Sequence, residues 1–281
     1  MKILRVLNGD KIIPAIEKNG KYYTLESVIK DFHTFYLNDE MLGMINNLQT
    51  KDLQEILVEQ NCIMEPIGGV KKLVCIGLNS LKHIEEMKLE TPEDPTFFMK
   101  ATSSITGPYS DIIYQNNMRK VDWEAELAVV IGKKGKNIKK ENAYEYILGY
   151  TCLNDVSDRY WQFEKSGGQF TKGKSFDTFA PLGPYIVTKD EIANPHDLKV
   201  KLKVNGLVRQ DFNTDDYLFK IDEIISYLSE LFTLEIGDVI SMGTGNGVAK
   251  FWNESYLVPG DNVVLEIEKI GFQSSNVKME A

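Results

Sequence analysis

The segment from Asp122 to Ile131 places the strongest constraint on how this chain can fold. An acidic run, DWEAE at 122–126, continues directly into the apolar run LAVVI at 127–131. Because side chains alternate across a β-strand, a strand here puts Glu124 and Glu126 on one face, at the mouth of a buried segment. Two adjacent carboxylates removed from water repel each other and are costly to bury. They therefore require a metal ion, a shared proton or basic neighbours.

A third carboxylate, Asp155, follows the next hydrophobic segment and can complete a site with Glu124 and Glu126. Carboxylates form an all-oxygen ligand set, which suits a hard cation such as Mg²⁺ or Mn²⁺ better than Zn²⁺. The alternative is that the three acids are solvated groups at strand ends. An i, i+2 pair of acids is common on exposed strands, and the apolar run after Glu126 is what raises the metal site above that background.

The composition of the chain is that of an ordinary globular protein. Its 281 residues are 43% apolar and 26% charged, enough for one large domain or one large domain plus a small one. The net charge of -9 argues against general binding of nucleic acid or anionic membranes. No apolar run approaches the roughly 20 residues of a membrane span, and the opening residues do not form a signal peptide. We expect a cytoplasmic protein with a small-molecule ligand.

The first 68 residues have the pattern of a small N-terminal α/β unit. Strand-like pieces at 11–17 and 21–25 flank a turn at 18–20, and apolar residues then recur at helical spacing from Leu25 to about Gln60. Gly68 and Gly69 mark a break. We therefore expect an N-terminal domain at 1–68 and a catalytic domain at 69–281.

Strand patterns dominate the larger part of the chain. They occur at 72–78, 127–131, 185–187, 198–204, 238–242 and 262–267. Helical patterns are fewer and occur at 80–87, 141–150 and 221–232. The pattern predicts a β-rich α+β fold.

Basic residues fall in or beside the segments that carry the three acids. They are Lys100, Arg159, Lys172 and Lys174. Three carboxylates around a divalent cation leave about one negative charge. The four basic side chains exceed this charge, so they can hold an anionic substrate. The alternative for each of them is a solvated surface base.

His83 and Glu86 are spaced i, i+3, so on a short helix they share a face. The carboxylate can then orient the imidazole as a general base. On the spacing alone, an ordinary surface helix is the favoured interpretation. A glycine-rich segment at 243–247 lacks the spacing of a dinucleotide-binding loop, although its backbone N–H groups can face an anion.

Taken in order, these segments resemble the fumarylacetoacetate hydrolase family. The resemblance rests on 76–79 with His83 and Glu86, 98–100, 124–127, 154–159, 174–176 and 243–244. It extends from about Leu73 to the C-terminus. The stretches 158–162 and 168–184 are similar to the branch that includes 2,4-diketo-3-deoxy sugar-acid hydrolases, many of which carry a ureidoglycolate lyase label.

The resemblance implies a mixed β-sandwich roll, usually a homodimer. Residues matching Glu124, Glu126 and Asp155 would bind Mg²⁺ or Mn²⁺. Residues that would hold a 2-oxo or 2,4-dioxo acid are Lys100, Arg159, Gln162, Lys174 and Thr244. His83 and Glu86 would lie on a lid over the site.

The activity implied by the resemblance is hydrolysis of a carbon–carbon bond in 2,4-dioxo acids, as in acylpyruvases. The metal and Lys174 would stabilise an enolate while His83 activates water, giving pyruvate and a carboxylic acid. The alternative is a lyase or isomerase of the oxaloacetate decarboxylase, 2-hydroxyhepta-2,4-diene-1,7-dioate isomerase or ureidoglycolate lyase type. Departures from the family pattern at Ser80 and at 245–246 leave a third alternative, a metal-dependent binding protein without turnover. Asp122 is expected to have a supporting role.

Overall fold

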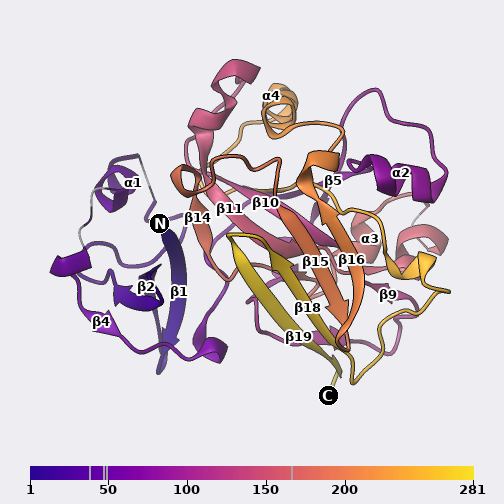
Figure 1. Ribbon diagram of the computed structural model, residues 1–281, viewed down its shortest axis with the longest axis horizontal. Coiled ribbons are helices and arrows are strands. Elements are labelled where there is room, and N and C mark those ends of the chain that lie inside the picture. Colours follow the sequence, from indigo (N-terminus) through magenta and orange to yellow (C-terminus); the bar gives the residue numbers. More distant parts are fainter. Residues whose placement is uncertain (38, 47, 49, 166) are drawn as a thin grey trace.

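A ten-stranded mixed sheet forms the centre of the computed structural model, which describes residues 1–37, 39–46, 48, 50–165 and 167–281 (Figure 1). Its strands, in spatial order, are β4 (Glu55–Ile56), β3 (Lys21–Thr24), β2 (Lys11–Lys18), β1 (Lys2–Asn8), β14 (Ile186–Thr188), β11 (Ile147–Asn154), β10 (Ala125–Ile131), β17 (Val239–Ser241), β5 (Leu73–Gly77) and β6 (Thr96–Lys100). Most neighbours are antiparallel, but β17 and β5 are parallel.

A second, five-stranded sheet lies against the first. Its order is β16 (Leu207–Asn213), β15 (Lys199–Val204), β18 (Asn262–Ile267), β19 (Gly271–Met279) and β8 (Ile112–Tyr114). Two short pairs complete the strands: β9 (Val121–Asp122) with β12 (Ser157–Asp158), and β7 (Ile105–Thr106) with β13 (Ala180–Pro181). The main apolar core contains side chains from both sheets, including Leu127, Val200 and Leu265. The prediction of a β-rich α+β sandwich is confirmed.

Strand β10 is buried along its whole length. Leu127 and Val129 pack into the core between the two sheets, whereas Ala128 and Val130 face a second apolar cluster on the opposite side. A strand covered on both faces needs apolar residues at every position. This explains the uninterrupted run after Glu126.

The described residues include four α-helices: α1 (Asp39–Asn46), α2 (Leu81–Met87), α3 (Thr171–Lys174) and α4 (Ile221–Leu231). The helix predicted at 221–232 is present as α4, and that at 80–87 as α2. The helix predicted at 141–150 is wrong, because a 3₁₀ helix at Lys140–Tyr146 leads directly into β11. None of the described helices is long and apolar enough to span a membrane.

The helical pattern between Leu25 and Gln60 is also largely wrong: the described residues there contain α1, short 3₁₀ turns and β4. Residues 38, 47 and 49 of that stretch lie outside the described residues.

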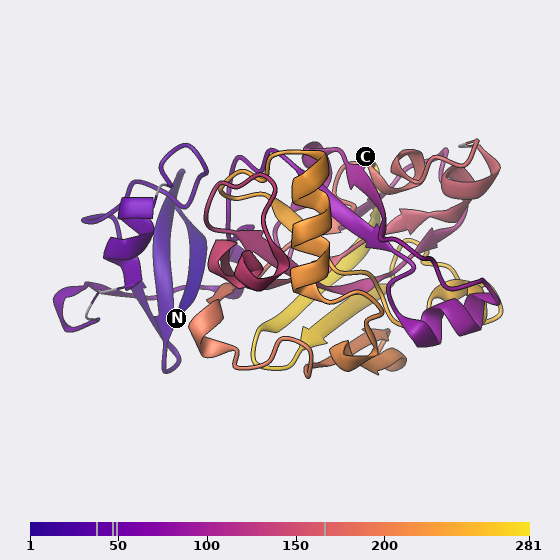
Figure 2. The same cartoon turned by 90° about the horizontal axis from the view of Figure 1, so that it is seen from above.

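The N-terminal strands extend the large sheet through the pairing of β1 with β14, and they lie at one side of the molecule (Figure 2). They also carry a small apolar cluster of their own, which includes Leu4, Ile13 and Ile63. Other N-terminal side chains, such as Ile3 and Phe32, share a second cluster with Ala128 and Val130 of β10. The division near residue 68 remains a proposal.

Candidate active site

Strand pairing brings the three acids together. Strands β10 and β11 are antiparallel with Ala125 opposite Asn154, so the end of β11 lies beside the start of β10. The Asp155 N–H donates to the Glu124 carbonyl over 2.9 Å. Glu124, Glu126 and Asp155 are all buried, and each offers a carboxylate oxygen within 4.8 Å of the others. The register of the sheet therefore fixes the spacing of the candidate ligands.

Lys174, at the end of α3, lies between two of these acids. Its Nζ is 2.6 Å from Glu124 and 2.8 Å from Asp155, and it also donates to the Ser157 hydroxyl over 2.7 Å. Burial acts to lower the pKa of Lys174, but Asp155 and Glu124 outweigh it and raise the pKa to about 12. Lys174 is therefore a fixed ammonium group at neutral pH.

Arg159 joins the metal-ligand candidates to Asp122. Its Nε donates to Asp122 over 2.9 Å, one terminal nitrogen lies 2.7 Å from Glu124, and the other donates to Gln162 over 2.8 Å. Burial acts to raise the pKa of Glu124, but Lys174 and Arg159 hold it well below its usual range. The supporting role expected for Asp122 corresponds to this contact with Arg159.

Glu126 differs from the other two acids because no basic side chain among the described residues forms an ion pair with it. Its carboxylate accepts hydrogen bonds from the Ser241 hydroxyl and, over 3.1 Å, from the Gly243 N–H. Burial, Asp155 and Glu124 raise its pKa well above the usual value. A buried carboxylate in this situation is stabilised by a cation, so the donor set fits a divalent metal.

The charges of the surrounding cluster agree with this. Four buried carboxylates face three buried cations: Asp122, Glu124, Glu126 and Asp155 against Lys100, Arg159 and Lys174. With all four acids ionised, a bound divalent cation would give the cluster a net charge of +1, which suits an anionic substrate.

Lys100 lies behind Asp155 and is absent from the described lining of the pocket above the acids. Its Nζ is 2.5 Å from Asp155 and donates to the carbonyls of Val156 and Phe179 over 3.2 and 2.8 Å. This placement favours a role in positioning Asp155 over the direct substrate contact that the sequence predicted.

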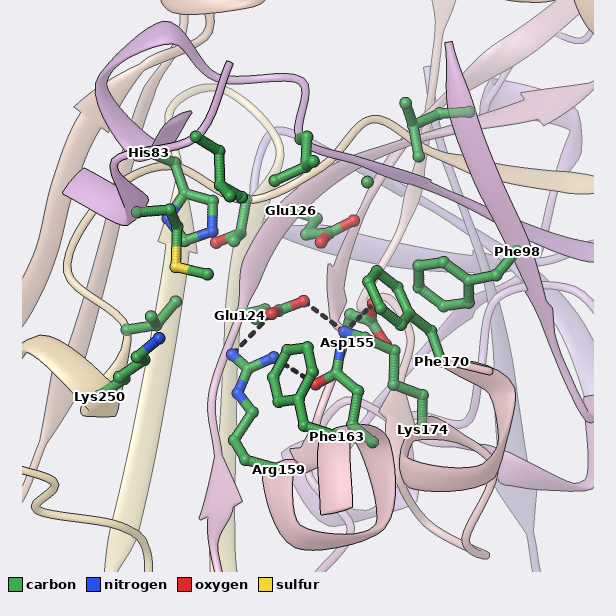
Figure 3. Close-up of a pocket in the computed structure, with 18 residues that line it drawn as sticks. His83, Phe98, Glu124, Glu126, Asp155, Arg159, Phe163, Phe170, Lys174 and Lys250 are labelled. Atoms are coloured by element: carbon green, nitrogen blue, oxygen red, sulfur yellow. Dashed lines mark hydrogen bonds and ion pairs between the residues drawn. The ribbon is translucent and has the colours of Figure 1, made fainter. Parts of the chain in front are cut away.

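His83 points from α2 into the pocket (Figure 3). Its Nδ1 lies 3.2 Å from Glu86, as expected for the pair. At the start of α2, the Ser80 hydroxyl accepts a hydrogen bond from the His83 N–H over 3.1 Å and contacts Asp216. Ser80, which departs from the family pattern, thus caps the helix that carries His83.

The glycine-rich loop at 243–247 connects the acids to this helix. Its first N–H, from Gly243, donates to Glu126, and its last, from Gly247, donates to both Glu86 oxygens over 3.1 Å. Gly247 has φ +96°, and a Cβ there would lie 2.2 Å from a backbone carbonyl, so only glycine fits. The anions that this loop binds are side chains of the protein itself.

The pocket above the acids encloses about 690 Å³, including its open mouth. Phe98, Phe163 and Phe170 form an aromatic wall on one side, and Lys250 lies on the other (Figure 3). Thr244 also lines the pocket, with its hydroxyl donating to the Ala125 carbonyl over 3.1 Å.

The sequence did not single out Phe163, Phe170 or Lys250. The available signals were the aromatic residues within the basic segment at 159–174 and the lysine that follows the glycine-rich loop.

A family model described as fumarylacetoacetate (FAA) hydrolase C-terminal matches residues 72–278, well over half of the chain. The chain belongs to the fumarylacetoacetate hydrolase family. Among relatives of this family, the oxaloacetate tautomerase FAHD2A, mitochondrial, of Bos taurus is 46% identical over 258 residues, which cover 92% of this chain and 82% of that protein.

Solved structures of the fumarylacetoacetate hydrolase family share the fold over the whole chain. The fumarylacetoacetate hydrolase of Exiguobacterium antarcticum has a TM-score of 0.87 and 32% identity, with all of both chains covered. Maleylpyruvate hydrolase of Sphingobium sp. SYK-6, in complex with manganese(II) and pyruvate, has a TM-score of 0.81 and 25% identity, again with full coverage of both chains.

These relationships make the protein an enzyme of the fumarylacetoacetate hydrolase family, with a small-molecule substrate. They do not specifically support the predicted hydrolysis of 2,4-dioxo acids, because the bovine relative is named a tautomerase. That name also includes the word mitochondrial, so the predicted cytoplasmic location is not confirmed. The homodimer stays a prediction.

Proposed function

We propose that the protein catalyses the enol–keto tautomerisation of oxaloacetate or a similar 2-oxo dicarboxylate, with Mg²⁺ or Mn²⁺ held by Glu124, Glu126 and Asp155. The observation that carries the choice of reaction is the 46% identity to an oxaloacetate tautomerase over 92% of the chain. The buried acids beside Lys174 support it, because this chemistry needs positive charge next to the 2-oxo group.

A divalent cation in this site would supply the positive charge that polarises a 2-oxo acid. Lys174 adds an ammonium group on the same side of the pocket, next to Glu124 and Asp155. Arg159 and Gln162 also line the pocket and offer polar groups to the substrate carboxylate. These residues bind and orient the anion and stabilise negative charge on its C2 oxygen.

His83 is the residue placed to move the proton. Its Nδ1 faces Glu86, which favours the tautomer that leaves Nε2 as a proton acceptor. In the proposed reaction Nε2 accepts the proton of the C2 enol hydroxyl and donates it to C3, so the C2 oxygen becomes a carbonyl. The imidazole returns to its starting protonation state, and no other reactant is needed.

The test follows the ultraviolet absorbance of enol-oxaloacetate after it is added to buffer containing Mg²⁺ or Mn²⁺. We expect the purified protein to accelerate the loss of the enol signal in a metal-dependent way. A rate equal to that of buffer with metal alone would refute the proposed activity.

Hydrolysis of 2,4-dioxo acids is the second candidate, and the contact between His83 and Glu86 favours it. Water activation at a C4 carbonyl needs an oriented general base, which this pair supplies. The assay is release of pyruvate from acetylpyruvate, followed with lactate dehydrogenase and NADH. Absence of pyruvate across a panel of acylpyruvates and diketo sugar acids would eliminate this candidate.

A further inference from the structure

Lys250 is a basic side chain that lines the pocket and has no role in the proposed proton transfer. Lys174 and Arg159 line the same pocket, and both form ion pairs with buried carboxylates. Lys250 is exposed, and no acid among the described residues forms an ion pair with it; its recorded contact is with the ring of Phe251, at 5.7 Å. Its charge therefore remains available to a ligand.

The backbone that carries Lys250 is anchored to the interior of the site. Lys250 lies in a 3₁₀ turn, Ala249–Phe251, and the Ala249 N–H donates to Asp122 over 2.8 Å. The same carboxylate accepts from Arg159 over 2.9 Å. One buried acid thus fixes the turn of Lys250 relative to Arg159, and the Lys250 amino group is directed toward Arg159 across the pocket (Figure 3).

The rest of the pocket offers little to a second carboxylate. The opposite wall consists of Phe98, Phe163 and Phe170, against which a carboxylate would lose hydration without a partner. Arg159 also lines the pocket, but the proposed function assigns it to the first carboxylate, next to the 2-oxo group, and its guanidinium also binds Asp122, Glu124 and Gln162. The Lys250 side is therefore the favourable direction for a second negative charge.

We propose that Lys250 binds the substrate carboxylate farthest from the three acids, and so selects dianionic 2-oxo acids over monoanionic ones. This inference rests on the proposed function, because it names the substrate class of the same site. Lys250 is a specificity-determining residue in this account, and it takes no part in the proton transfer.

The test compares two ligands of the metal-loaded full chain by isothermal titration: 2-oxoglutarate, which has a distal carboxylate, and 2-oxobutyrate, which lacks one. We expect Lys250→Gln to reduce the preference for 2-oxoglutarate by about tenfold, equivalent to about 1.4 kcal/mol. Lys250→Arg should restore most of the preference. The matched control is Lys82→Gln, which removes the same charge from the exposed face of α2 and should leave the preference intact.

Equal weakening of both ligands by Lys250→Gln, or no change in their ratio, would overturn the inference. A similar change in the Lys82→Gln control would also overturn it, because the effect would then be general electrostatic attraction. Failure of the wild type to tautomerise oxaloacetate would remove the proposed function. The ratio of the two affinities would still decide the role of Lys250.

Discussion

Asp122 accepts a hydrogen bond from Arg159 over 2.9 Å in a fully buried position, and its other oxygen accepts from the backbone of Ala249 and Trp123. One side chain thus joins the start of the acidic segment to two loops of the site. An amide in its place would turn an N–H₂ group toward donors, which breaks at least one of these contacts.

We therefore predict that Asp122→Asn lowers the free energy of unfolding by roughly 3 kcal/mol, as expected when one partner of a buried ion pair is removed. Urea unfolding monitored by circular dichroism measures the change. The control is Asp211→Asn, which breaks an exposed ion pair with Lys201 at 3.2 Å and should cost less than about 1 kcal/mol. Equal losses in the two variants would contradict the structural role of Asp122.

Glu126→Gln should affect metal binding and the stability of the metal-free protein in opposite directions. Loss of a ligand should weaken Mn²⁺ binding at least about tenfold. Replacement of a buried carboxylate that lacks an ion pair should raise the melting temperature of the chelator-treated protein. Titration calorimetry and thermal unfolding give the two readouts, with the exposed Glu266→Gln as control. Wild-type Mn²⁺ affinity in Glu126→Gln would rule out this acid as a ligand.

His83→Ala should reduce kcat for the active substrate by about 10²- to 10⁴-fold, because a positioned general base contributes that much. KM should change less than threefold if substrate is held mainly by the basic groups and the metal. His196→Ala is the control, since that ring contacts Tyr144 outside the pocket. Retention of full tautomerase activity by His83→Ala would exclude His83 as the proton carrier.

His196 also gives a pH dependence that can be tested separately from the active site. Burial, with help from Lys220, lowers the pKa of His196, so the folded protein takes up this proton at lower pH than the unfolded chain. The stability linked to His196 is therefore present above about pH 6.5 and is lost as the pH falls through the folded-state pKa.

We predict that the wild type loses more unfolding free energy than His196→Gln between pH 7.5 and pH 5. The half-buried ring is partly screened by solvent, so the difference should stay below about 1 kcal/mol. Urea titrations of both proteins at the two pH values provide the measurement. Parallel losses would show that His196 does not contribute.

Much of the fold could be predicted because its elements have simple periodic patterns. Strand β18 alternates between fully buried positions and partly buried or exposed ones, and α4 has one apolar face. The helix predicted at 141–150 failed for an equally physical reason. Strand β11 is buried at all eight positions, so it has no alternation, and periodicity cannot distinguish a fully buried strand from a buried helix.

The pairing of Glu124 with Glu126 could be predicted because their i, i+2 spacing is local, whereas the roles of the lysines could not be predicted. Lys100 ends the apolar run 97–99 and Lys174 lies in the segment KGK at 172–174, but neither context shows that Lys100 lies behind Asp155 and that Lys174 lines the pocket. That difference depends on contacts between residues distant in sequence. The same is true of Lys250, whose position depends on the hydrogen bond from Ala249 to Asp122.

The antiparallel register of β10 and β11 separates the parts of this enzyme that can change from those that cannot. Glu124 and Asp155 directly flank the paired ends of these strands and are joined by a backbone hydrogen bond of 2.9 Å, and a shift of one residue would turn the side chains of β10 to the opposite face. Phe163, Phe170 and Lys250 lie outside the sheets, so they can be exchanged without disturbing the strands. Substrate preference can therefore diversify through these segments while the three buried acids keep their places.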